Sequence, residues 1–428
     1  MFPSTGFRTE NSANPPLITG FLIFDSLISG NVDLAIDVLY HYALPSIVLT
    51  VAITALMTRL FSSQVAKDSY KKNTILSNTA KTIMALGVIF TYLILIDVTF
   101  GLYGFGSIFL RSLYDLDYFL FRGLVFAFLM IFALTIFVSN LIFSLKTMKK
   151  DRILPQDDIE EILEREPNLG AKLEIKNYLN KIVRSPLAII GLIAVLIPIF
   201  IAIFPELVSG HTLEDAFSLD YNQWGPPTLA HLLGQGRLGR DVLTLVVFGA
   251  RDSLIFGFSA ALIGLIGGLA IGLLASKFNR IAHTITMSIT LIFYIMPGIL
   301  LAIALSFYPM QELIRFEQTF GFLLFTTGFL LVPSFTRIIT NTKFQIVPMG
   351  KKIISYLPLF VGFAISFYMS LGFLGFINYR TVQLGELIRN ARYHLVDAPC
   401  ASLYPGLIAF LIIASLFILH EGLAKCSK

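Results

Sequence analysis

The chain has 428 residues, of which 56% are hydrophobic and 14% are charged, with a formal net charge of +5 and a mean hydropathy of +0.78. A soluble domain usually carries about a quarter charged residues, so the charges present here are too few to cover a soluble body of this size. Many apolar stretches also exceed the roughly 18 residues that mark a membrane-spanning helix. The composition excludes soluble enzyme folds and predicts an all-α polytopic membrane protein.

Apolar runs of membrane length predict nine transmembrane helices. They cover residues 43–61, 80–99, 121–145, 187–204, 253–276, 282–306, 319–336, 354–376 and 402–420. Before the first of these helices, residues 18–40 are apolar but interrupted by glycines and aspartates. We interpret this segment as an external amphipathic segment, with an additional short span as the alternative. No charged region followed by an apolar segment precedes the first span, so no cleavable signal peptide is expected.

The distribution of basic residues predicts the orientation in the membrane. If residues 62–79 face the cytoplasm, every lysine falls on the cytoplasmic side, and the basic residues left outside are all arginine. Because lysine and arginine resist translocation, the sequence predicts an external N-terminus and a cytoplasmic C-terminus. The positive net charge then reflects membrane insertion, and no nucleic-acid partner is expected.

One charged segment, residues 146–184, divides the apolar sequence. Residues 155–167 are predicted to form a short helix that Pro167 ends. Apolar residues then recur at helical spacing beside lysines: Leu173, Leu179, Ile182 and Val183. This pattern is typical of a helix on the inner membrane surface. We interpret the whole segment as a cytoplasmic linker between two membrane halves, with a docking platform for another protein as the alternative.

Residues 234–239 read Gly-Gln-Gly-Arg-Leu-Gly and match the GxGxxG pattern. A dinucleotide site needs a preceding strand and a βαβ unit, whereas this run stands on the predicted outer face and leads into a membrane helix. No GxxxxGK[ST] run occurs. The histidines and the two cysteines, Cys400 and Cys426, show neither zinc spacing nor a disulfide framework. The sequence therefore predicts no nucleotide, cofactor or metal, and no enzyme.

Acidic residues near membrane depth can mark ion pathways. Asp97 stands near the outer end of its predicted helix, where we expect it to reach interfacial water, with a proton or ion role as the alternative. Arg240-Asp241 and Arg251-Asp252 are external pairs at the opening of the predicted helix 253–276. Ion pairing and helix starting are the favoured roles for both pairs, and substrate contact is the alternative.

The run from His231 to Asp241, His-Leu-Leu-Gly-Gln-Gly-Arg-Leu-Gly-Arg-Asp, and the run Gly-Ala-Arg-Asp-Ser-Leu at 249–254 resemble the permeases of bacterial ABC importers for peptides and nickel. The C-type subunit of that family has a similar HPLGTD-x-x-GRD run, followed by GAR-x-SL at its second span. The matching residues are Gly234, Gly239, Arg240, Asp241, Arg251 and Ser253. The resemblance covers about residues 180–425 and includes six spans.

The first part of the chain is similar to the last three spans of the partner, B-type subunit, most clearly in Asp-Val-Thr-Phe-Gly-Leu-Tyr-Gly-Phe-Gly at 97–106. Tyr103 stands where a proline is usual. The resemblance implies a truncated B-type half (1–145), the charged linker (146–184) and a complete C-type half (185–428), with three and six spans. It also implies a bacterial inner-membrane protein with other membrane subunits, an ATPase and an external solute-binding protein as partners.

The chain departs from that family at the contact with the ATPase. Family members carry a cytoplasmic loop with an EAA-x-x-x-G run that forms a coupling helix, and the equivalent segments here, 62–79 and about 338–353, lack the run. Coupling requires a physical element that both sites bias, so import through the usual ATPase contact is not expected. Two hypotheses follow: a permease subunit with non-standard coupling, or a permease-derived scaffold of a larger membrane complex that does not transport.

Overall fold

A computed structural model describes residues 6–9, 15–65, 92–115, single positions between 89 and 130, 170–216, 223–277, 316–342, 345–375 and 382–427. The regular elements in these ranges are helices, and one isolated bridge joins Gln235 to Asp241. The predicted all-α fold is confirmed. Contacts divide the chain into two compact units, Met1–Asp158 and Ile159–Lys428.

Six helices of the described residues are long and apolar enough to cross a membrane, and a bent pair of helices is a seventh candidate. The six are α2 (Val32–Val65), α7 (Pro186–Ile203), α10 (Val242–Lys277), α13 (Phe316–Asn341), α14 (Ile346–Leu374) and α16 (Pro399–Cys426). The polytopic prediction is confirmed. The predicted span 282–306, most of 121–145 and the predicted helix 155–167 lie outside the described residues, so the total of nine spans stays a prediction.

In the first unit, residues 18–40 do not form one external segment. They form α1 (Leu22–Ile28), a turn at Gly30, and the beginning of α2, which runs on through the predicted span 43–61. The turn before α1 is held by Asp25, whose carboxylate accepts hydrogen bonds from the Thr19 hydroxyl at 2.6 Å and the Thr19 amide at 2.7 Å. The bond from the Thr19 hydroxyl holds the pKa of Asp25 below its usual value.

The bent pair joins the helix Tyr92–Phe100 to α4 (Phe105–Tyr114), whose first two turns make an angle of 82° with it. The break between them contains Gly101 with φ of 61° and Tyr103 with φ of 57°. Proline is restricted to φ near −65°, so Tyr103 adopts a conformation that the usual proline of the resembled family cannot adopt. The backbone at position 103 is therefore one that tyrosine, but not proline, can adopt.

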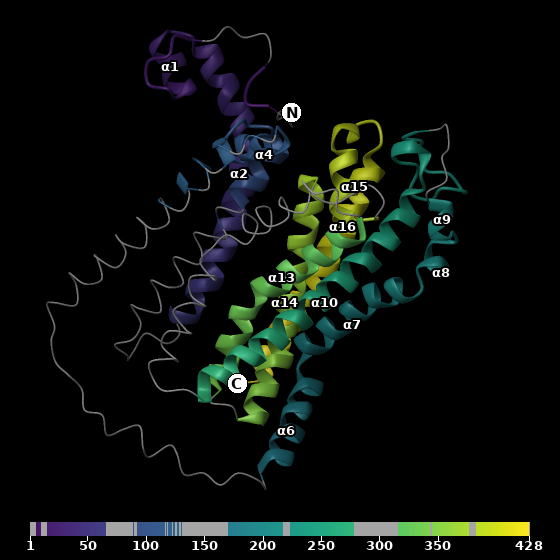
Figure 1. The fold of residues 1–428 in the computed structure, drawn as a ribbon. Coiled ribbons are helices and arrows are strands. Elements are labelled where there is room, and N and C mark those ends of the chain that lie inside the picture. Colours follow the sequence, from purple (N-terminus) through teal and green to yellow (C-terminus); the bar gives the residue numbers. More distant parts are fainter. Residues whose placement is uncertain are drawn as a thin grey trace, which may run out of the picture. The chain divides into compact units, whose positions relative to one another are not determined.

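The second unit is a bundle in which α7, α10, α13, α14 and α16 lie alongside one another, with α15 (Leu384–Ala391) at one end and α6 (Gly170–Arg184) at the other (Figure 1). Short helices α8 (Pro205–Ser209) and α9 (Leu213–Ala216) follow α7. The spans predicted at 187–204 and 402–420 correspond to α7 and α16.

Helix α10 packs closely on α13 because glycines recur every four residues along the contact. A Cβ atom added at Gly264, Gly268 or Gly272 would come within 2.6, 2.4 or 2.9 Å of a side chain of α13. Helices in membranes associate through such rows of small residues, which let the backbones approach. The apolar side chains of α13 fill the space that the missing Cβ atoms leave.

The prediction of a loop at about 338–353 is wrong. Helix α13 continues to Asn341 and α14 begins at Ile346, so only residues 342–345 join them. Thr342 closes the end of α13 by donating from Oγ1 to the Ile339 carbonyl at 2.7 Å. Lys351 and Lys352, which suggested a loop, therefore lie within α14. In the equivalent segment of the first unit, residues 66–79 lie outside the described residues.

Candidate functional site

The loop 231–241 leads directly into α10, and Asp241 forms the N-terminal cap of that helix. Its Oδ2 accepts hydrogen bonds from the Thr244 amide at 2.7 Å and the Thr244 hydroxyl at 2.6 Å. Its Oδ1 lies 3.2 Å from His231 Nδ1. An aspartate at this position satisfies backbone amides that have no partner within the helix, so Asp241 has the predicted helix-start role.

The same geometry corrects the predicted start of this helix at residue 253. Arg251, Asp252 and Ser253 do not open α10 but lie in its third and fourth turns, since the helix begins at Val242. Arg251 is exposed, whereas Ser253 is buried and donates to the Gly249 carbonyl at 2.8 Å.

The glycines of the loop 231–241 are required by its backbone. Gly234 has φ of 77°, and a Cβ atom there would lie 2.6 Å from the Gly225 carbonyl oxygen. Gly239 has φ of 71° and follows Leu238, which also has a positive φ of 64°. Backbone bonds from Gln235 to Gly225 and from Gly236 to Arg240 close the loop. The glycines therefore build a tight turn onto a membrane helix.

Replacing Asp241 by alanine is expected to reduce the free energy of unfolding by about 1–2 kcal/mol, because α10 loses its cap. The control is Asp241→Asn, since asparagine caps a helix about as well as aspartate. Thermal unfolding of the two purified variants in mild detergent measures the difference. Equal unfolding temperatures for the alanine and asparagine variants would show that the cap contributes nothing.

Helix α15 is held against α14 by Gln383, its N-terminal capping residue. The Gln383 amide donates to the Tyr368 carbonyl at 2.7 Å, and its side-chain oxygen accepts from the Glu386 amide at 3.0 Å. Gly385 allows the approach: a Cβ atom there would lie 2.0 Å from the Met369 carbonyl oxygen. Leu384 packs beside Gly249 of α10. The short helix therefore contacts both α14 and α10.

This position of α15 brings Glu386 beside the arginines of the loop 231–241. Glu386 is 6% exposed, and its Oε1 lies 3.9 Å from the guanidinium of Arg389. Arg237 and Arg240 interact with it electrostatically. Burial raises the pKa of Glu386 and lowers the pKa of Arg240, while the opposite charges partly offset both effects. We call Glu386, Arg237, Arg240 and Arg389 the polar cluster.

The raised pKa of Glu386 predicts a pH dependence of stability. As pH rises from the ordinary glutamate range, the unfolded chain releases its proton first, so stability falls until the pH passes the higher native pKa. Glu386→Gln removes the titrating carboxyl group, so this variant is expected to lose the decrease in stability with rising pH that Glu386 causes. The unfolding temperatures of the native chain and of the Glu386→Gln variant, compared from about pH 4 to about pH 8, measure this difference. Parallel curves would contradict the prediction.

Beneath the polar cluster, Asp252 of α10 pairs with Tyr368 of α14. The Tyr368 hydroxyl donates to Asp252 Oδ2 at 2.6 Å. The Tyr368 ring is fully buried and stacks on Phe256 at 3.9 Å between centroids, while Phe320 meets it edge to face at 6.2 Å. An acid in a membrane helix is costly and is most often functional, so this pair is a candidate functional group.

In the first unit, Asp97 caps the helix that follows it. Its two carboxylate oxygens accept hydrogen bonds from the amides of Gly104 and Ser107, each at 2.8 Å. Asp97 is 7% exposed, so the expectation that it reaches interfacial water is wrong. The two backbone donors and the positive end of the α4 dipole satisfy the carboxylate.

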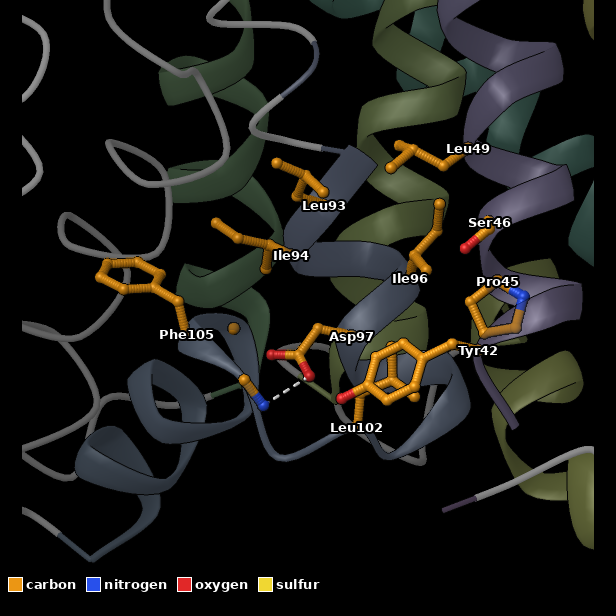
Figure 2. Close-up of a pocket in the computed structure, with 12 residues that line it drawn as sticks. Tyr42, Pro45, Ser46, Leu49, Leu93, Ile94, Ile96, Asp97, Leu102 and Phe105 are labelled. Carbon is orange, nitrogen blue, oxygen red and sulfur yellow. Dashed lines mark hydrogen bonds between the residues drawn. The ribbon is translucent and has the colours of Figure 1, made fainter. Parts of the chain in front are cut away.

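Asp97 also lies at one end of a pocket of about 340 Å³ between α2 and the helix Tyr92–Phe100 (Figure 2). The ring of Tyr42 lies beside it, and Leu49 and Leu93 lie at the opposite end. The walls are mostly apolar, and Asp97 is the acid among the lining residues. The pocket belongs to the first unit and shares no residue with the polar cluster.

The sequence pointed to Arg240 and Asp241 but missed Tyr368, Gln383 and Glu386. A signal for α15 was present, since a glutamine three residues before a glutamate resembles a reciprocal helix cap. No comparable signal marks Tyr368, whose partner Asp252 is 116 residues away. In the part of the chain that the structure describes, no three His, Cys, Asp or Glu side chains are placed to hold a metal ion.

The fold defines a polytopic helical membrane protein whose family-motif residues gather around one end of its second unit. No protein-family model matches the chain. The dipeptide transport system permease protein DppC of Alkalihalophilus pseudofirmus is 30% identical over 269 residues, which cover 56% of this chain and 84% of that protein. The glutathione transport system permease protein GsiD of Pectobacterium atrosepticum is 26% identical over 274 residues, covering 58% of this chain and 88% of that protein.

A GsiD protein of Escherichia coli (strain UTI89 / UPEC) is 26% identical over 266 residues, which cover 56% of this chain and 85% of that protein. The chain belongs to the permease family of the peptide-class ABC importers, as the sequence motifs predicted. These relatives are transport permeases and not enzymes, and the comparisons favour a permease over a non-transporting scaffold.

Proposed function

We propose that the chain is the membrane-embedded subunit through which a bacterial importer moves small peptides across the inner membrane. The observation that carries the proposal is the 30% identity to a dipeptide permease over 84% of its length. The described part of the second unit supplies five long apolar helices, as a solute path through a bundle requires. Solutes of dipeptide or glutathione size are the substrate class that the relatives suggest.

The architecture that supports this role is a B-type half at 1–145, the linker at 146–184 and a C-type half at 185–428. We place the N-terminus outside and the C-terminus in the cytoplasm, because lysines then lie inside. The partners are an ATPase, an external solute-binding protein and further membrane subunits. Since four residues join α13 to α14, the ATPase would meet the ends of these two helices and not a separate coupling helix between them.

Within the second unit, we place Asp252 and Tyr368 next to the solute path. Helix α10 has 36 residues, which at 1.5 Å per residue exceeds the roughly 30 Å of a membrane core. Asp252 lies ten residues after the first residue of α10, so its depth is near the outer boundary of the core. A carboxylate at this depth suits the ammonium group of a peptide.

Uptake of a tritium-labelled dipeptide tests the proposal. A strain without the chain is expected to lose uptake, and plasmid-borne chain is expected to restore it. Asp252→Asn is expected to lower the restored rate about tenfold, and Asp215→Asn, which changes an exposed aspartate of α9 in the same way, serves as the control. Unchanged uptake of dialanine, of a tripeptide and of glutathione in the strain without the chain would overturn the proposed function. An unchanged rate with Asp252→Asn would overturn only the placement of Asp252.

A further inference from the structure

Helix α6 exposes an apolar stripe that the described residues do not cover. Ile175, Leu179 and Val183 are 47%, 55% and 70% exposed. They are spaced four residues apart, so they share one face of the helix. Exposed apolar side chains in a continuous row mark a surface that meets another apolar body.

The rotation of α6 about its axis is fixed by a polar contact on a neighbouring face. Tyr178 is 6% exposed, and its hydroxyl lies 3.1 Å from Ser355 Oγ of α14. Ser355 is tied in turn to α16, since its carbonyl lies 2.6 Å from His420 Nδ1. Lys351 adds an ion pair with Glu174 at 3.1 Å. These contacts direct the apolar stripe away from α14 and α16.

Charge and position indicate what meets the apolar stripe. Lys176, Lys181 and Arg184 are exposed on the same helix. Arg184 is followed by Ser185, which caps α7, and the membrane span starts at Pro186. Helix α6 therefore ends where the chain enters the membrane. Apolar side chains beside basic ones at this boundary are typical of a helix in the headgroup layer, where anionic lipids attract lysine and arginine.

We propose that α6 is a lipid-binding helix of the leaflet in which α7 begins. Ile175, Leu179 and Val183 insert among the acyl chains, and Lys176 and Arg184 bind the phosphates of anionic phospholipids. Through its contact with Ser355, Tyr178 links the lipid-bound helix to α14 and, through His420, to α16. The proposal concerns a lipid surface and does not rest on transport.

A single tryptophan placed on α6 tests the lipid contact. The native chain has one tryptophan, so Trp224→Phe gives a silent background for Leu179→Trp. Asn177→Trp is the matched control, because Asn177 is exposed on nearly the opposite side of the helix. Both full-length proteins are reconstituted in bilayers containing phospholipids brominated on their acyl chains, and fluorescence quenching is measured.

Quenching at position 179 is expected to be at least about threefold stronger than at 177, while aqueous iodide is expected to quench 177 more strongly. Equal quenching by the brominated lipid at both positions would overturn the proposal. A tryptophan at 179 that neither agent quenches would also overturn it, because another protein segment would then cover the apolar stripe.

A second comparison tests whether the basic residues of α6 bind anionic lipid. Brominated phosphatidylglycerol is expected to quench position 179 more than the same fraction of brominated phosphatidylcholine, by up to about fivefold for each basic residue in contact. The double variant Lys176→Gln/Arg184→Gln is expected to lose this preference while quenching by phosphatidylcholine persists. A preference that survives the double substitution would overturn the assignment of Lys176 and Arg184.

Discussion

Gly385→Ala is expected to detach α15 from α14 and to lower the free energy of unfolding by about 3 kcal/mol. The added Cβ atom would lie 2.0 Å from the Met369 carbonyl oxygen and 3.0 Å from the Phe373 amide nitrogen. Both contacts are with backbone atoms, so no side-chain rotation relieves them. Thermal unfolding measures the loss of stability. Hydrogen exchange of the amides at 384–391 measures the detachment, because a helix released from its packing opens more readily.

Gly350→Ala is the control for this prediction. Gly350 lies inside α14, and apart from its chain neighbours and the backbone of its own helix no atom of the described residues would lie within 4 Å of an added Cβ. Alanine is a better helix former than glycine, so this variant is expected to gain about 0.5–1 kcal/mol. If Gly385→Ala were as stable as Gly350→Ala, with unchanged exchange at 384–391, the described packing of α15 would be wrong.

Gly268→Leu is expected to disrupt the contact between α10 and α13, with a loss of about 3 kcal/mol. Even a Cβ atom at this position would lie 2.4 Å from Phe335 Cβ and 3.0 Å from the Thr336 amide nitrogen. The helices would have to separate, which removes the close packing that stabilises helix pairs in membranes. The measured quantity is the unfolding temperature in mild detergent.

Gly321→Leu provides the comparison, since Gly321 is an exposed residue of α13, and apart from its chain neighbours and its own helix no described residue would lie within 4 Å of an added Cβ. Leucine there is expected to be tolerated. A similar drop in unfolding temperature for both variants would mean that the general effect of leucine, and not the helix contact, explains the loss.

The long helices were predictable because apolar length alone identifies a membrane span. The start of α10 was not, because Arg251 and Asp252 looked like charges at a membrane boundary. The structure places them inside the helix, where Asp252 meets Tyr368 from a distant part of the chain. A tertiary partner of this kind leaves no mark in local hydropathy.

The candidate site was predictable only in part. The loop that carries Arg240 and Asp241 was recognised from its motif, and Asp241 has the expected helix-start role. Glu386 was missed because α15 has eight residues, too few for a span, and its position depends on close approach at Gly385. Asp97 was predicted to reach interfacial water because the sequence does not show that the chain bends after its helix. This bend lets the Gly104 amide donate a hydrogen bond to the Asp97 carboxylate.

The central proposal is that this permease-family chain moves small peptides. The most direct measurement is accumulation of tritium-labelled dialanine in proteoliposomes that contain the chain with the subunits that co-purify with it. With an external solute-binding protein on one side, we expect accumulation when ATP is present on the other side and none without it. Hydrolysis of ATP by the same preparation without accumulation of dialanine, a labelled tripeptide or glutathione would contradict the proposed transport of small peptides.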